Sequence, residues 1–170
     1  MTTYKDQRVG IFIDIQNLYH SAKNLYNSRV NYKELIRHMV GGRKLIRAVA
    51  YVVKTETTAG EGSFFEALKG AGLELRVKDL QVYPGGMKKA DWDVGMAVDA
   101  IRMVEFLDAV ILMTGDGDFI PLVDYLKWGR GRGVEVAAFS RTTSSKLKEV
   151  VDSFTAIEDI PKSLLKIKEH

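Results

Sequence analysis

Two aspartates, Asp116 and Asp118, lie at alternate positions of the segment Thr114-Gly115-Asp116-Gly117-Asp118. The two glycines permit a tight turn with positive φ, in which both carboxylates can point into one small volume. Their mutual repulsion is costly unless a cation lies between them, and hard oxygen ligands of this kind suit Mg²⁺ or Mn²⁺. The segment therefore predicts a divalent metal site. The simpler alternative is that Asp118 caps the following helix while Asp116 shapes the turn.

A third aspartate, Asp14, favours the metal site, because a helix cap explains one acid but not acids that follow two separate strands. Asp14 follows the apolar run Val9–Ile13, with Asn17 three residues later, and the run Ala109–Met113 precedes the glycine segment. Both runs are typical of strands buried on both faces, as in a parallel sheet. Open α/β sheets build their ligand crevices at the carboxyl ends of such strands. We therefore expect both strands to deliver acids to one rim.

A fourth aspartate, Asp93, begins the longest helical pattern of the chain, residues 91–107. The expected buried stripe of this helix consists of Val94, Ala97, Val98, Ile101 and Val104. Asp93 borders this stripe, whereas Asp99 lies six residues further on, ~120° around a straight helix, so the two cannot easily reach one metal. Asp93 is the expected ligand, and Asp99 is expected to support the site indirectly or to be structural. Alternatively, Asp91 and Asp93 simply suit a helix N-terminus.

Basic and aromatic side chains form a further group of candidates. The basic residues expected in loops or at helix ends are Lys88, Lys89, Arg130, Arg132, Arg141 and Lys146. Such cations can contact the phosphates of a nucleic acid, and Trp92 can stack on a base. The alternative is that the cations are solvated charges, favoured near helix C-termini, and that Trp92 packs against the protein.

Composition sets the outer limits of the interpretation. The 170 residues are expected to form one domain with a substantial core. The chain contains no cysteine, which excludes disulfides and thiolate metal sites. No apolar run has the length of a signal sequence or of a membrane span, so the cytoplasm is the expected location. The formal charge of +3 permits a polyanionic partner without requiring one.

Alternating strand and helix patterns predict the fold. Strands are expected at residues 8–15, 45–53, 73–77, 109–113 and 134–139. Helices are expected at residues 16–27, 32–40, 63–70, 91–107, 119–128, 144–151 and 161–168, with loops at 54–62 and 80–90. Asn31 is the expected cap of the second helix. This alternation predicts a three-layer α/β/α sandwich with a mostly parallel, Rossmann-like central sheet.

Three motifs occur in order between residues 8 and 122. Residues 11–17 read Ile-Phe-Ile-Asp-Ile-Gln-Asn, and residues 89–94 read Lys-Ala-Asp-Trp-Asp-Val, followed by Asp99. Residues 114–122 read Thr-Gly-Asp-Gly-Asp-Phe-Ile-Pro-Leu, close to a Ser-Gly-Asp-x-Asp-Phe-x-Pro pattern in which Thr114 keeps the hydroxyl of the usual serine. Together these motifs resemble NYN domains, the LabA-like branch of the PIN-like nuclease superfamily.

The resemblance implies metal-dependent cleavage of RNA. The implied metal-binding and catalytic residues are Asp14, Asp93, Asp116 and Asp118, around one or two Mg²⁺ or Mn²⁺ ions. Asn17 and Thr114 would hold a carboxylate, a water or a phosphate oxygen, and Lys89 would neutralise the substrate backbone. A flexible single strand is the expected RNA partner, since a stiff duplex could not easily enter a cleft. No nicotinamide cofactor and no membrane is expected.

Other functions stay open. The glycine segment also resembles the metal motif of haloacid-dehalogenase-type phosphatases, but Gln16 stands where that mechanism needs a second acid. Dinucleotide binding is disfavoured, because no Gly-x-Gly-x-x-Gly follows the first strand. A non-catalytic RNA-binding or regulatory module is the other alternative, since an intact acidic cluster indicates only that an ion site can form.

Overall fold

Six strands form the central sheet of the computed structural model, which describes residues 2–54, 61–86, 88–89 and 91–168. In spatial order the strands are β4 (Glu74–Asp79), β3 (Lys44–Lys54), β1 (Arg8–Asp14), β7 (Ala109–Met113), β8 (Gly133–Ala138) and β9 (Ser153–Ala156). Every neighbouring pair is parallel. The α/β architecture with a parallel sheet is therefore confirmed.

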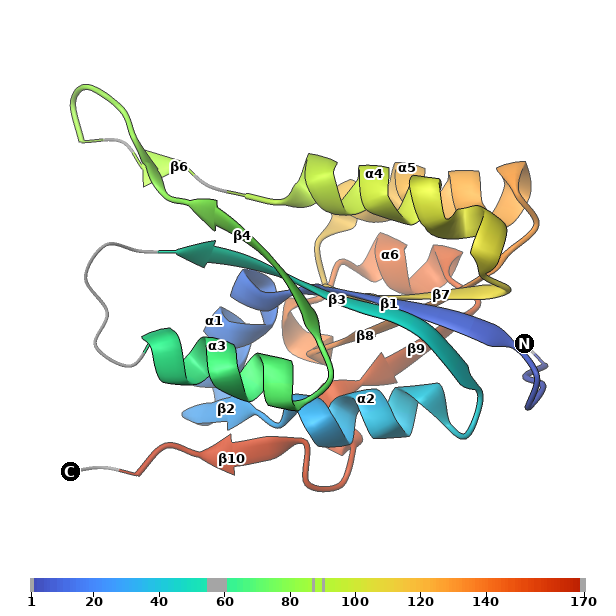
Figure 1. Ribbon diagram of the computed structural model, residues 1–170, viewed down its shortest axis with the longest axis horizontal. Helices are drawn as coiled ribbons and strands as arrows, with labels where there is room; N and C mark the ends of the chain where they lie inside the picture. The colour runs from blue at the N-terminus through green and yellow to red at the C-terminus, as the bar shows by residue number, and fades with distance from the viewer. Residues whose placement is uncertain (1, 55–60, 87, 90, 169–170) are drawn as a thin grey trace.

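Helices cover both faces of this sheet (Figure 1). One face carries α1 (Ile15–Tyr26), α2 (Tyr32–Val40) and α3 (Glu61–Gly70). The other face carries α4 (Asp93–Met103), α5 (Ile120–Asp124) and α6 (Ser145–Val150). Within the described ranges, no helix is long and apolar enough to cross a membrane.

The chain reverses its direction across the sheet between β1 and β7. From β1 it proceeds outward through β3 to β4, and it then returns to β7 and proceeds the other way through β8 to β9. The two central strands pair from Val9 with Ala109 to Ile13 with Met113. Apart from Gly10, every residue in this register has a fully buried side chain. Such a reversal opens a crevice at the carboxyl ends of the two strands.

Side-chain caps fix the first turns of three helices around the sheet. The Asp14 carboxylate accepts from the backbone N–H of Asn17 and caps α1, and Asn31 caps α2 by accepting from Glu34, as expected. Ser144 caps α6 in the same way. Each cap satisfies an N–H group that has no partner within its helix.

The buried stripe expected for α4 is mostly wrong. Val94, Val98 and Ile101 are 76%, 45% and 41% exposed, whereas Met96 and Asp99 are buried. Apolar spacing alone predicts the stripe and takes no account of charged partners on other elements. The structure instead turns Asp99 inward, because distant residues neutralise its charge there. The helix also ends at Met103 and continues as a short 3₁₀ turn, η1 (Val104–Phe106).

The expected C-terminal helix at residues 161–168 is also wrong. This part of the chain contains β10 (Leu164–Lys166), which pairs antiparallel with β2 (Ser28–Val30). Both strands and the edge strand β9 are too short to give a clear alternating pattern. Pairing between segments far apart in sequence decides their conformation, so local preference is a weak guide here.

The remaining differences lie in the loops. Residues 80–90 contain a short hairpin, in which β5 (Gln81–Val82) pairs antiparallel with β6 (Lys88–Lys89). The helix expected at residues 119–128 is irregular: the 3₁₀ turn η2 (Gly117–Phe119) precedes α5, and the π-turn η3 (Tyr125–Gly129) follows it. Most of the loop expected at residues 54–62 lies outside the described residues.

Candidate metal centre

A cavity of about 300 Å³ lies at the carboxyl ends of the central strands. Its acidic lining residues are Asp14, Asp91, Asp93 and Asp116. Asp14 ends β1, Asp116 follows β7, and Asp93 is the first residue of α4. The acids of three separate segments therefore meet at the crevice that the reversal of the chain creates.

Asp93, Asp116 and Asp118 each offer a carboxylate oxygen, and these three oxygens lie within 4.8 Å of one another. Three hard, anionic donors this close together have the chemistry and the spacing that bind Mg²⁺ or Mn²⁺. The residues present thus fit a divalent cation.

The electrostatics of Asp93 reflect this crowding. Its pKa is raised from 3.8 to about 6, first by partial burial and then by the charges of Asp116 and Asp14. A carboxyl group whose ionisation is opposed by burial and by its acidic neighbours favours a bound cation, which would relieve both costs.

Asp14 lies beside the cluster of Asp93, Asp116 and Asp118 but is not part of it. Its carboxylate accepts from the N–H of Asn17 and from the Thr114 hydroxyl, each at 3.2 Å. Burial raises the pKa of Asp14, and these two hydrogen bonds oppose the rise. Asp14 lines the same cavity and acts electrostatically on Asp93. The structure therefore places the fourth expected acid at the site, held by its own hydrogen bonds.

Asn17 and Thr114 join β1 to the turn after β7. The Asn17 side-chain oxygen accepts from the N–H of Gly115 at 3.0 Å. The Thr114 hydroxyl, which is fully buried, donates to Asp14 and accepts from the N–H of Asp116 at 3.2 Å. Thr114 therefore bonds to both acids directly, whereas the Asn17 side chain holds the backbone of the turn.

The simpler alternative for the glycine turn is half correct. Asp116 does shape the turn, but Asp118 does not cap the following helix. Asp116 accepts from the N–H of Asp118 at 2.9 Å and caps the 3₁₀ turn η2. The Asp118 carboxylate makes no hydrogen bond or ion pair with the residues that the structure describes. A helix cap therefore accounts for one carboxylate of the turn and leaves the other unexplained.

The glycines of the turn serve close packing, not positive φ as expected. Neither Gly115 nor Gly117 has a positive φ. A Cβ atom at Gly115 would lie 2.8 Å from Thr143 Oγ1, and one at Gly117 would lie 3.0 Å from Ser144 Oγ. The turn thus needs glycine because the loop after β8 passes directly against it.

Asp99 does not join the acids of the cavity. It accepts from the Tyr51 hydroxyl at 2.8 Å and from Arg76 Nη1 at 2.8 and 2.9 Å, and it is 2% exposed. Tyr51 itself lines the cavity. Asp99 is therefore a buried acid paired with Tyr51 and Arg76, and among the described residues it contacts the cavity only through Tyr51.

Trp92 lies at the edge of the cavity, but its ring is engaged by the protein. Its Nε1 donates to the carbonyl of Val52 at 2.9 Å, and Lys78 Nζ lies 4.5 Å from the ring centroid. A Cβ atom at Gly95 would lie 2.5 Å from the ring. These contacts favour the packing alternative over base stacking.

The expected basic residues divide into three groups. Arg130 pairs with Glu105, and Arg132 donates to the carbonyl of Val104, in the loop before β8. That loop lies at the amino end of β8. These two arginines are therefore at the amino ends of the strands, whereas the acids are at the carboxyl ends. The structure does not bring them to the site.

Arg141 and Lys146 lie at the carboxyl ends of the strands, as the acids do. Arg141 is in the 3₁₀ turn η4 (Ser140–Thr142), directly after β8, and Lys146 is in the first turn of α6. Both are exposed and have no ion pair among the described residues. Lys88 and Lys89 belong to β6, and their side chains lie outside what the structure describes.

Several residues of the cavity were not predicted from the sequence. Asp91 accepts from the N–H of Asp93 at 3.2 Å, and His20 and Tyr51 also form the lining. His20 follows Gln16 by four residues on α1, so the helical period places both on the same side. That spacing was the available signal for His20, whereas nothing local indicates Tyr51.

Known proteins resemble this chain over most of its length. The NYN domain family matches residues 8–158, which include all six strands of the central sheet. The low amplitude and bright protein LabA of Synechococcus elongatus is 22% identical over 172 aligned positions, covering 92% of this chain and 87% of LabA. A crystal structure of VPA0982 from Vibrio parahaemolyticus, described as a protein of unknown function, is 32% identical, with a TM-score of 0.86, covering 97% of this chain and all of that one. The chain therefore belongs to the NYN domain family, within the PIN-like nuclease superfamily.

Proposed function

We propose that this protein is a metal-dependent ribonuclease that hydrolyses phosphodiester bonds in single-stranded RNA. The observation that carries the proposal is the meeting of Asp93, Asp116 and Asp118 within 4.8 Å at the crevice of an NYN domain. The Asp118 carboxylate is the most informative member, because no contact with the described residues accounts for it.

The side chains have distinct roles in this proposal. Asp93, Asp116 and Asp118 hold one or two Mg²⁺ or Mn²⁺ ions, with Asp14 as a further ligand or as the acceptor for an ordered water. A divalent ion bound there supplies an activated water and stabilises charge on the phosphate. Thr114 and Asn17 keep Asp14 and the glycine turn in place, so the carboxylates are ordered before the substrate arrives.

Arg141 and Lys146 are proposed to contact the RNA backbone. Both are exposed on the carboxyl edge of the sheet, beside the loop that packs on Gly115 and Gly117. Cations at this position can neutralise phosphates on either side of the scissile bond without reading the sequence. Arg130 and Arg132 have no part in this contact, because they lie at the opposite edge.

The test is cleavage of an end-labelled single-stranded RNA, and of its matched duplex, with Mg²⁺, with Mn²⁺ and with EDTA. Asp118→Asn is the informative variant, because the Asp118 carboxylate caps no helix. Asp124→Asn, an equal change of charge at an exposed residue of α5, is the matched control.

The expected result is metal-dependent cleavage of the single strand by wild type and Asp124→Asn, with the rate reduced at least ~100-fold in Asp118→Asn. Faster cleavage of the duplex would contradict the assignment of a single-stranded substrate. Saturable RNA binding without cleavage under any metal would identify a binding module instead of an enzyme.

A further inference from the structure

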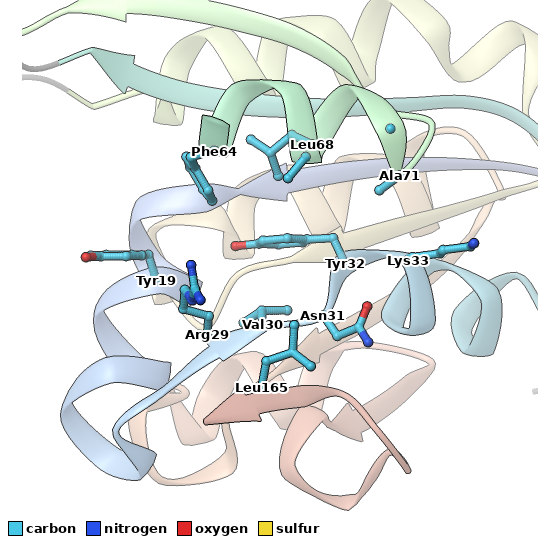
Figure 2. A pocket seen from close by; sticks show the side chains of 12 residues that line it. Tyr19, Arg29, Val30, Asn31, Tyr32, Lys33, Phe64, Leu68, Ala71 and Leu165 are labelled. Carbon is cyan, nitrogen blue, oxygen red and sulfur yellow. The ribbon is translucent and has the colours of Figure 1, made fainter. Parts of the chain in front are cut away.

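A second cavity, of about 310 Å³, is shown in Figure 2. Tyr19 of α1 lines this cavity, whereas Asn17 and His20 of the same helix line the acidic one. Its lining residues come from α1, β2, the start of α2, α3 and its C-terminal end, and β10. Its apolar wall is formed by Val30, Phe64, Ala67, Leu68, Ala71 and Leu165. A cavity of this size is at the lower limit for small-molecule sites.

The Tyr32 hydroxyl is the polar group inside this cavity. Tyr32 is 8% exposed, and its hydroxyl has no hydrogen-bond partner among the described residues. Figure 2 shows the phenol reaching into the space between Phe64 and Arg29. Burial raises the pKa of Tyr32 well above its usual range, so the group is neutral and available as a donor. Among the described residues no fully buried side-chain oxygen lacks a partner, so the Tyr32 hydroxyl is open to the cavity and can donate to a polar edge of whatever occupies it.

Two cations stand at the rim of the cavity. Arg29 and Lys33 both contribute to its lining, are exposed, and form no ion pair with any described residue. The nearby acid, Glu34, is already paired with Arg37 at 2.8 Å. The rim is therefore positively charged, and the first turn of α2 adds the positive end of a helix dipole. An anionic group attached to the ligand would be stabilised here.

Aromatic side chains link this cavity to the acids. His20 lines the acidic cavity and Tyr19 lines the apolar one, and their rings meet edge to face with centroids 5.5 Å apart. Tyr19 is in turn 6.5 Å from Phe64, which lies in the apolar wall. A strand that leaves the acidic cavity across α1 would therefore meet stacking surfaces on its way to the second cavity.

We propose that the second cavity binds one nucleobase of the RNA strand whose backbone is held at the acids. The base of a nucleotide has apolar faces for the wall and a polar edge for the Tyr32 hydroxyl, and the attached phosphate suits Arg29 and Lys33. A fatty acyl chain would leave the hydroxyl unpaired. The proposal rests on the proposed function for the identity of the strand, and it assigns the base specificity of the protein to Tyr32.

Methyl NMR of the full chain in EDTA tests base binding without cleavage. The probes are the four nucleoside 5′-monophosphates, a single-stranded RNA octamer and benzoate. Binding in the second cavity is expected to shift the methyl resonances of Val30, Leu68 and Leu165 saturably with nucleotide and octamer, and not with benzoate. Ala71→Trp, which fills the cavity, should abolish these shifts.

Tyr32→Phe keeps the test decisive if Ala71→Trp does not fold, because it removes a single oxygen. It should weaken nucleotide binding about fivefold and flatten the ranking of the four bases, since only the hydrogen bond is lost. Tyr125→Phe, on the other face of the sheet, is the matched control and should leave binding unchanged.

The outcomes separate this proposal from the nuclease proposal. RNA cleavage without methyl shifts would overturn base binding here and leave the nuclease intact. Methyl shifts without cleavage would overturn the nuclease and support a nucleotide-binding cavity. A response to benzoate but not to nucleotides would overturn the nucleobase as occupant, as would wild-type base ranking in Tyr32→Phe.

Discussion

The Thr114 hydroxyl donates to Asp14 Oδ2 at 3.2 Å and accepts from the N–H of Asp116 at the same distance. One buried side chain thus connects the acid at the end of β1 with the acid of the turn after β7. The two central strands carry their acids to the rim, and Thr114 fixes their relative positions there.

Thr114→Val keeps the shape of the side chain and removes both hydrogen bonds. It is expected to lower the free energy of unfolding by about 1–3 kcal/mol, because buried polar partners are left unsatisfied. RNA cleavage should fall by about 10- to 100-fold, as for other changes that support a metal site indirectly. Thr114→Ser, which keeps the hydroxyl, should retain most of both quantities. Equal loss in Ser and Val variants, by urea unfolding and by cleavage rate, would argue against this role.

Asp93 gives the protein a pH dependence of stability in the absence of metal. Its pKa is raised from 3.8 to about 6 in the folded state, so the folded protein binds more protons than the unfolded chain between these values. The contribution of Asp93 to stability therefore falls as the pH rises from about 4 to about 6 and stays low above that. Asp93→Asn should match wild type near pH 3.5 and be more stable above pH 6. Urea unfolding in EDTA across this range measures the difference, and equal stability at pH 7 would contradict it.

Asp99 has the opposite effect on stability, because its charge is compensated. Asp99→Ala removes the acceptor of Tyr51 and Arg76 and is expected to cost about 2 kcal/mol. This cost is below the ~3–5 kcal/mol for breaking a fully buried pair, since the Arg76 side chain is 45% exposed. Thermal unfolding beside Asp93→Asn at pH 7 compares the two acids directly. A stability gain in Asp99→Ala would show that its pairing does not offset burial.

Divalent metal should stabilise the protein through the three clustered carboxylates. Millimolar Mn²⁺ is expected to raise the melting temperature of wild type, because ligand binding to the folded state alone increases stability. The increase should disappear in Asp118→Asn and persist in Asp124→Asn. Differential scanning fluorimetry with and without EDTA gives this comparison, and an undiminished shift in Asp118→Asn would place the ion elsewhere.

The sequence was most informative where apolar runs are unbroken. The runs at Val9–Ile13 and Ala109–Met113 indicate buried strands, and the acids that follow them, Asp14 at once and Asp116 after Thr114-Gly115, predicted the rim on which they meet. Caps such as Asn31 were also predictable, because their hydrogen bonds are local. These features depend on neighbours within a few residues.

Features that depend on distant partners were not predictable in this way. The inward face of α4 is set by Tyr51 and Arg76, which neutralise Asp99 from β3 and β4. The strand β10 exists because β2 offers it hydrogen bonds, and the partner strand lies more than 130 residues away in the sequence. From the sequence, Arg132 and Arg141 have the same expected role in binding phosphates, because both follow or precede a strand in a loop. The structure separates them, since the two loops lie at opposite ends of β8.

The central claim is that the clustered carboxylates hold the ion that RNA cleavage needs. The most direct test titrates Mn²⁺ into wild type and Asp118→Asn, following bound Mn²⁺ by electron paramagnetic resonance and cleavage of a labelled single-stranded RNA in the same samples. We predict that cleavage by wild type rises with site occupancy and that Asp118→Asn loses both together. Cleavage at full rate in EDTA, or in a folded Asp118→Asn protein that no longer binds Mn²⁺, would contradict the account.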